Sequence, residues 1–239
     1  MSNLIKSISF SDQEILNNIL TLYISESQFH LDPTYSKGLI YTNIPQPLLK
    51  YDLHPQTPDT LQANANNLPL NNNSISSIVF DPPFLFGNHG GFKTGGNIIA
   101  KRFSHFASFQ DLEAMYTSCL AEFYRILRVN GYLIFKCQDL TDTRTTMTHI
   151  YVHNWAQNAG FYAKDLFIKI ATGGRIHNPK QKQKHARKFH SYYYVFQKTH
   201  NSGLNRGANL LTTKDLGNTQ RPEMSDKNEI IDSINKAAT

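Results

Sequence analysis

Residues 74–84 read SISSIVFDPPF, and this stretch decides the fold. The nearly continuous apolar run from Ile75 to Phe80 is typical of a central strand of a parallel sheet, which is covered on both faces. A stiff turn follows at once, because Pro82 and Pro83 hold φ at about −65° and have no N–H to donate. We therefore expect Asp81 at the carboxyl end of a central strand.

Helical and strand patterns alternate on both sides of this segment. We expect helices over residues 11–24, 108–127 and 143–158, where apolar residues recur at helical spacing. Ser11 is the N-cap of the first helix, and Asn130-Gly131 stops the second. The remaining expected strands cover residues 29–31, 39–41, 47–53, 132–136, 161–171 and 191–198.

Such alternation predicts βαβ units and an α/β fold with a doubly wound, mostly parallel sheet that ends in a hairpin-like pair of strands. We expect an N-terminal helical extension over residues 1–28 and one main domain over residues 29–199. A polar tail over residues 200–239 is expected to be largely disordered, with a short helix near residues 228–237.

Composition excludes several classes of protein. Two cysteines, Cys119 and Cys137, fall in an expected helix and an expected strand, so we predict no disulfide framework and a reducing, cytoplasmic location. Two cysteines also exclude a zinc site built from cysteine alone, and no His-rich ligand spacing is present, so we predict no metal. No apolar run approaches the roughly 18 residues of a spanning helix, so we expect no membrane span.

Positive charge is concentrated in one segment. The 239 residues include 24 Lys+Arg and 18 Asp+Glu, a formal net charge of +6. Eight basic residues and no acidic residue lie from Lys169 to Lys198, and removing those eight charges leaves −2 for the rest of the chain. A segment of this kind is typical of a polyanion contact, although a solvated basic loop gives the same pattern.

The chemistry of residues 81–84 suits a planar amine. The proline-rich turn presents carbonyl acceptors only, Asp81 adds a carboxylate, and Phe84 adds a flat apolar face. The exocyclic amine of a nucleobase needs several acceptors and a stacking surface. Hydrogen bonds from its N–H groups to Asp81 and to the Pro82 carbonyl would hold the amine and favour positive charge developing on its nitrogen during attack on a methyl donor.

On Asp81, Pro82, Pro83 and Phe84 the sequence resembles the N6-adenine and N4-cytosine methyltransferases of nucleic acids, whose motif is D-P-P-[YFW]. The resemblance covers about residues 29–198 and implies a seven-stranded fold that uses S-adenosylmethionine, with the motif after the fourth strand. It implies catalysis at the four motif residues on a base that has left the stack. Asp at the first position favours adenine N6 over cytosine N4.

The resemblance also implies a donor site, with one departure. The Gly-rich F-x-G-x-G loop of the family is missing, and the nearest match is the turn over residues 32–38. Asp52 resembles the acidic residue that holds ribose hydroxyls, and residues 64–69, NANNLP, resemble the D-A-x-x-L-P loop near the cofactor adenine. Asp52 could instead be a capping or turn residue, and residues 64–69 could be an ordinary asparagine-rich turn. The implied cofactor contacts are Asp32, Tyr35, Gly38, Asp52, Asn64 and Leu68.

Within the basic segment, residues 175–190 resemble the loop between the last two strands that family members place against the nucleic-acid backbone. The candidate contacts are Arg175, His177, Asn178, Lys182, Lys184, Arg187, Lys188 and His190. Residues 87–96 are rich in glycine and are expected to close over the substrate base, although a flexible surface loop gives the same pattern. DNA is favoured over RNA as the polymer. The same chemistry on RNA and a nucleic-acid-binding module without catalysis stay open, and the sequence does not give the oligomeric state.

Overall fold

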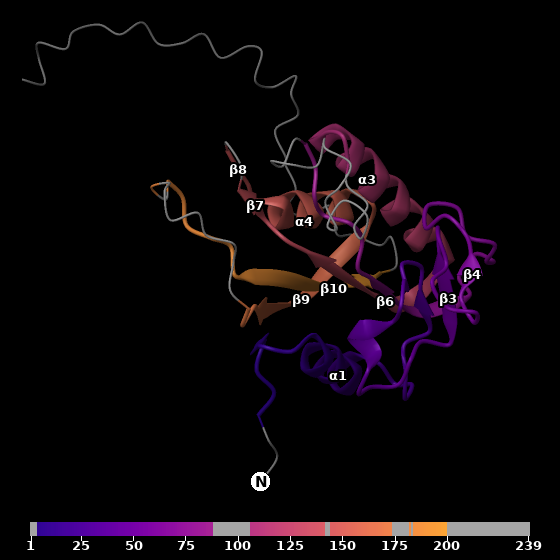
Figure 1. The fold of residues 1–239 in the computed structure, drawn as a ribbon. Helices are drawn as coiled ribbons and strands as arrows, with labels where there is room; N and C mark the ends of the chain where they lie inside the picture. Colours follow the sequence, from indigo (N-terminus) through magenta and orange to yellow (C-terminus); the bar gives the residue numbers. More distant parts are fainter. Residues whose placement is uncertain (1–3, 88–105, 142–143, 174–181, 183, 200–239) are drawn as a thin grey trace, which may run out of the picture. The chain divides into compact units, whose positions relative to one another are not determined.

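An eight-stranded sheet organises the fold (Figure 1). In this computed structural model the described residues are 4–87, 106–141, 144–173, 182 and 184–199. In chain order, the strands of the large sheet are β1 (Ile8–Ser9), β2 (Leu31–Asp32), β3 (Leu49–Asp52), β4 (Leu61–Gln62), β5 (Ile75–Phe80), β6 (Leu127–Cys137), β9 (Phe161–Ile170) and β10 (His190–Lys198). A separate two-stranded ribbon pairs β7 (Leu140–Thr141) with β8 (Thr145–Thr146).

The strand order is β1-β9-β10-β6-β5-β2-β3-β4, and the sheet is mostly parallel. Within the described residues, β10 is the one strand of this sheet that pairs antiparallel, with β6 on one side and β9 on the other. The expected mostly parallel sheet and terminal antiparallel pair are therefore confirmed. The sheet contains eight strands rather than the expected seven, because β1 adds to the edge beside β9.

Helices cover both faces of the sheet, as expected for a doubly wound fold. On one face, α1 (Asp12–Tyr23) packs in a core cluster with Val79, Ile134 and Tyr193. On the other face, α3 (Phe109–Ile126) and α4 (Thr148–Asn158) border a second cluster that includes Phe80 and Phe135 (Figure 1). Through α1 and β1, the N-terminal segment contributes to the same sheet and core as the rest of the fold.

The helix over residues 108–127 and the strand over residues 74–80 are confirmed almost to the residue. The strand expected at residues 39–41 is wrong: Leu39–Tyr41 form a 3-10 helix, η1, which begins after Gly38 at φ 62°. The predicted stop at Asn130-Gly131 is also wrong. Helix α3 ends at Ile126, and β6 starts at Leu127 and runs through Asn130-Gly131, where Asn130 has φ 65° and the pairing with β5 shifts register.

The strand directions bring distant segments to one edge of the sheet. In the eight-stranded sheet, every strand but β10 runs in the same direction, and we call the edge at which these parallel strands end the carboxyl edge. The loops after β2, β3, β4 and β5 emerge there together. The part of the basic segment between β9 and β10 follows β9 at this edge, and β10 begins there. Ligands of open α/β sheets bind at this edge, where the strand order reverses direction. In this sheet the reversal lies between β2 and β5, which pair directly.

Candidate active site

Asp81 follows β5, one of the two strands at the point where the strand order reverses. All six residues of β5 are buried, and the ring of Phe80 makes edge-to-face contacts with Phe123 and Phe135 at centroid distances of 4.8 and 4.9 Å. Aromatic pairs in this geometry add to the stability that burial provides. The strand that carries Asp81 is thus firmly anchored in the core.

Three side chains from separate elements fix the turn over residues 81–84. The Asp81 backbone N–H donates to Thr34 Oγ1 at 3.1 Å, and the Tyr116 hydroxyl donates to the Pro83 carbonyl at 2.8 Å. Lys136 Nζ donates to Asp81 Oδ2 at 2.9 Å. Pro82 is buried, whereas Asp81 and Phe84 are half-buried at this edge. The turn is therefore rigid and keeps a carboxylate and an aromatic ring accessible.

Lys136 connects this turn to helix α1. Its Nζ lies 2.9 Å from Asp81 Oδ2 and 3.4 Å from Asp12 Oδ1, and the side chain is only 15% exposed. Burial alone would lower the pKa of Lys136, but Asp81 and Asp12 outweigh burial and hold the pKa above its usual value. Lys136 and Asp12 are not among the site residues predicted from the sequence. A lysine inside the apolar run of residues 132–137 was the available signal.

Asp32 is buried at the end of β2 and holds the loop that follows it. One carboxylate oxygen accepts from the Thr34 N–H at 2.7 Å and from its hydroxyl at 3.2 Å, and the other accepts from the Tyr41 hydroxyl at 2.8 Å. The side chain is 1% exposed. Burial and, to a smaller extent, the Asp81 charge raise the pKa of Asp32 to about 7, against the hydrogen bonds from Tyr41 and Thr34, which lower it.

Tyr35 and Gly38 pack against each other in the same loop. A Cβ on Gly38 would lie 2.2 Å from the Tyr35 hydroxyl oxygen, so only glycine fits beneath this ring. Tyr35 is buried, stacks on Tyr41 at a centroid distance of 5.9 Å, and lies under Lys50 Nζ at 5.1 Å from the ring centroid. Tyr35 and η1 thus brace the loop at the position where the family resemblance implies a Gly-rich turn.

Asp52 ends β3 and joins two adjacent loops at the carboxyl edge. Its Oδ2 accepts from the Ser36 N–H at 2.8 Å, and its Oδ1 accepts from the His54 N–H at 2.8 Å. A carboxylate offers about four acceptor positions, so two such bonds leave acceptor capacity on this half-buried group. Asp52 is therefore held in place and can still accept hydrogen bonds from hydroxyl groups.

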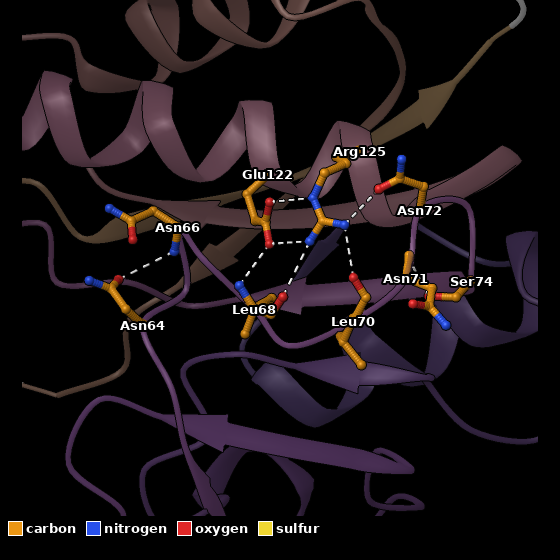
Figure 2. A network of polar contacts seen from close by, with 9 residues as sticks. All are labelled: Asn64, Asn66, Leu68, Leu70, Asn71, Asn72, Ser74, Glu122 and Arg125. Atoms are coloured by element: carbon orange, nitrogen blue, oxygen red, sulfur yellow. Dashed lines mark hydrogen bonds and ion pairs between the residues drawn. The ribbon is translucent and has the colours of Figure 1, made fainter.

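The loop with Asn64 and Leu68 is clamped to α3 by an ion pair (Figure 2). Glu122 Oε1 accepts from the Leu68 N–H at 2.7 Å and from Arg125 at 2.6 Å. Arg125 also donates to the carbonyls of Leu68 and Leu70, at 3.2 and 2.8 Å. Burial alone would raise the pKa of Glu122, but Arg125 and the Leu68 N–H lower it below its usual value. Leu68 is buried, whereas Asn64 is exposed and its side-chain oxygen accepts from the Asn66 N–H at 3.3 Å.

The basic segment is described in part. Lys182, Lys184 and Arg187 are exposed, and Lys188 and His190 are half-buried. Arg175, His177 and Asn178 lie outside the described residues, as do most of the glycine-rich stretch 87–96 and the tail 200–239. The described cations belong to the segment that joins β9 to β10, and this segment emerges at the same sheet edge as Asp81.

A second polar cluster surrounds the start of β10. Asp139, which is 5% exposed, accepts from His149 Nδ1 at 2.7 Å when that nitrogen carries a proton, and from the Tyr192 hydroxyl at 3.3 Å. The rings of His149 and Tyr192 stack at a centroid distance of 4.2 Å, and His190 Nε2 lies 2.9 Å from the Tyr192 hydroxyl. His190 thus contacts the fold through Tyr192 at the start of β10.

The described residues contain neither a membrane-spanning helix nor a metal-binding cluster. No described helix combines the length and apolar character needed to cross a membrane. Within the same residues, no group of three or more His, Cys, Asp or Glu side chains could hold a metal ion. Cys119 and Cys137 are buried free thiols on α3 and β6, which confirms their expected helix and strand positions.

No protein-family model matches the sequence, and no curated protein matches it. Solved structures with a similar fold include a chain from the complex of the Haloferax volcanii Trm112 methyltransferase activator with a candidate methyltransferase, at 12% identity, 79% coverage of this chain, 90% of that chain and a TM-score of 0.49. TrmN from Thermus thermophilus is 16% identical, and the match covers 78% of this chain and 48% of TrmN with a TM-score of 0.44. A candidate DNA modification methylase from Thermus thermophilus, solved with S-adenosyl-L-methionine, is 15% identical. The match covers 67% of this chain and 61% of the methylase, with a TM-score of 0.41. At these scores, the description of the fold rests on the strand order of this chain.

Proposed function

We propose that the protein is an S-adenosylmethionine-dependent methyltransferase that modifies an exocyclic amine of a base in DNA, with adenine N6 as the favoured position. The observation that carries this proposal is the location of Asp81-Pro82-Pro83-Phe84. The tetrapeptide lies at the carboxyl end of β5, beside β2, where open α/β sheets bind their ligands.

The rigid turn supplies what the amine needs. The Asp81 carboxylate and the Pro82 carbonyl accept hydrogen bonds from the amine N–H groups, and Phe84 offers a ring against which the base can stack. These bonds orient the amine nitrogen and favour positive charge on it as its lone pair forms the new N–C bond and the S–C bond of the sulfonium donor breaks; the nitrogen then loses one proton to solvent. Thr34 and Tyr116 hold the turn from either side, so little reorganisation is needed when the base enters.

The residues on the β2 side of the turn fit a nucleoside-containing donor. S-adenosylmethionine supplies the electrophilic methyl group. Asp52 retains acceptor capacity for ribose hydroxyls, and the amide of Asn64 can both donate to and accept from an adenine ring edge. The Glu122–Arg125 clamp fixes the loop that carries Asn64 (Figure 2). Asp32, Tyr35 and Gly38 shape the first loop, and Leu68 provides an apolar wall.

The polymer would bind along the basic segment. Exposed Lys182, Lys184 and Arg187 suit contacts with phosphates, which position a nucleic acid without reading its sequence. Arg175, His177 and Asn178 are proposed to extend this contact, together with Lys188 and His190. A duplex hides the amine from an enclosed pocket, so the target base must leave the stack before it reaches Asp81.

Mass spectrometry of nucleosides tests the proposal directly. Purified protein is incubated with methyl-labelled S-adenosylmethionine and either DNA or RNA, and the digest is searched for N6-methyladenine and N4-methylcytosine. Label in DNA adenine that is lost in Asp81→Ala and kept in Asp59→Ala, a change at an exposed carboxylate that pairs with Lys50, is the expected result. Label in RNA alone would move the substrate to that polymer. Full activity of Asp81→Ala would refute the proposed chemistry.

A further inference from the structure

Helix α1 reaches the catalytic turn through a chain of charges. Asp12, the first residue of α1, has its Oδ1 3.4 Å from Lys136 Nζ and its Oδ2 2.6 Å from Lys169 Nζ. Asp12 Oδ1 also accepts from the Tyr193 hydroxyl. Lys136 in turn donates to Asp81 at 2.9 Å. A residue that precedes the expected domain boundary at position 29 is therefore two contacts away from the catalytic carboxylate.

We infer that Lys136 is the positioning residue for Asp81, and that Asp12 fixes Lys136 in that role, so that α1 is a working part of the catalytic turn. This inference rests on the proposed function of the turn. Lys136 lies on β6, whose Phe135 is paired with Phe80 of β5. The register therefore places the ammonium group directly beside the residue that follows β5.

The position of Lys136 between two carboxylates explains how one ammonium group can orient Asp81. A buried ammonium is costly unless hydrogen bonds and opposite charges satisfy it, and Lys136 has a carboxylate from each of two elements. Asp12 restricts where Nζ can lie, so the hydrogen bond to Asp81 Oδ2 is held in one place. That bond fixes the rotation of the Asp81 carboxylate and hence the direction in which its acceptor positions point.

Other titratable groups surround the bridge on every side. Asp32 and Tyr41 lie toward the loop after β2, Tyr116 approaches from α3, and Tyr193 lies on β10 with its ring centroid 5.4 Å from Lys136 Nζ. The pKa of Tyr193 is well above its usual value, through burial first and then through Asp81 and Asp12. The tyrosines are therefore neutral, and Lys136 supplies the positive charge that contacts Asp81.

Kinetics with matched variants test the assignment. Lys136→Met should lower kcat by about 10- to 100-fold, the effect of misplacing a catalytic group, while KM for S-adenosylmethionine stays within about twofold. Lys136→Arg should recover part of the loss. Arg128→Met, which removes an exposed cation paired with Glu26, should leave kcat unchanged. Equal activity of Lys136→Met and Arg128→Met would overturn the inference.

A second measurement does not depend on activity. Titration of the Lys136 side chain by carbon NMR should give a lower midpoint in Asp12→Asn and in Asp81→Asn than in the unmodified protein, because each change removes a carboxylate that raises the Lys136 pKa. The same midpoint in all three proteins would overturn the bridge. If the unmodified protein methylates neither DNA nor RNA, the proposed function fails, whereas this titration still decides whether Lys136 joins the two carboxylates.

Discussion

Protonation of Asp32 should make the stability of the fold depend on pH in a defined direction. Burial raises the pKa of this carboxyl from 3.8 to about 7 in the folded protein. At about 1.4 kcal/mol for each pKa unit, the difference corresponds to roughly 4 kcal/mol of free energy. The folded state binds the proton more tightly than the unfolded state, so this contribution to stability falls as pH rises from about 4 to about 7, and is constant above.

Asp32→Asn isolates this effect, because the amide has nearly the same shape as the carboxylic acid and carries no charge. Its carbonyl oxygen can still accept from the Thr34 N–H, and its NH₂ group can donate to the Tyr41 hydroxyl. The free energy of unfolding of the variant, relative to the unmodified protein, should therefore increase by roughly 2.5 kcal/mol between pH 5 and pH 8. Above pH 7 the variant should be the more stable protein.

Urea denaturation of both proteins at four values from pH 5 to pH 8 measures this difference. Other groups that titrate in this range, such as His30, whose pKa is lowered by burial, are common to both proteins and cancel. Asp59→Asn is the matched control, since its hydrogen bond with Lys50 lowers the pKa of that exposed carboxyl below 3.8 and out of the range. A difference between Asp32→Asn and the unmodified protein that does not change with pH would refute the reasoning.

Two further predictions concern the loop clamp and the basic segment. Arg125→Ala removes bonds to two loop carbonyls and to nearly buried Glu122, and should lower the free energy of unfolding by about 3 kcal/mol in urea denaturation, against less than about 1 kcal/mol for exposed Arg128→Ala. The logarithm of the binding constant for DNA falls with the logarithm of the salt concentration, and the magnitude of this negative slope should decrease by about 1 in each of Lys184→Ala and Arg187→Ala. Fluorescence anisotropy with labelled DNA measures the slope. An unchanged slope in both variants would remove these cations from the contact.

The central part of the fold could be predicted because its signal is local. All six residues of β5 are buried, so the strand needed an almost continuous apolar run, which is readable in the sequence. Helix α3 combines an apolar stripe with Ser108, whose side chain accepts from the Asp111 N–H. In both cases the residues that form the element also reveal it.

The short elements of the fold and the Lys136–Asp12 pair could not be predicted, because they depend on contacts between residues that are distant in the sequence. Leu39–Tyr41 is too short for periodicity to separate a strand from a helical turn, and the hydrogen bond from Tyr41 to Asp32 favours the turn. Strands β1 and β4 contain two residues each and exist because a neighbouring strand pairs with them. Lys136 pairs with Asp12, which lies far earlier in the chain, and no local spacing links the two.

Several acidic side chains lie near the sheet edge at which a nucleic acid is proposed to bind, and their negative charge is largely offset. Asp12, Asp32 and Asp81 lie near the sheet edge from which the basic segment also emerges, and three negative charges there would repel a nucleic acid. Lys136 offsets charge on two of these carboxylates, and the Asp32 pKa of about 7 leaves that group largely protonated in slightly acidic conditions. The turn can therefore keep the acceptor oxygens that an amine requires while the surrounding edge, with the basic segment, stays attractive to a polyanion.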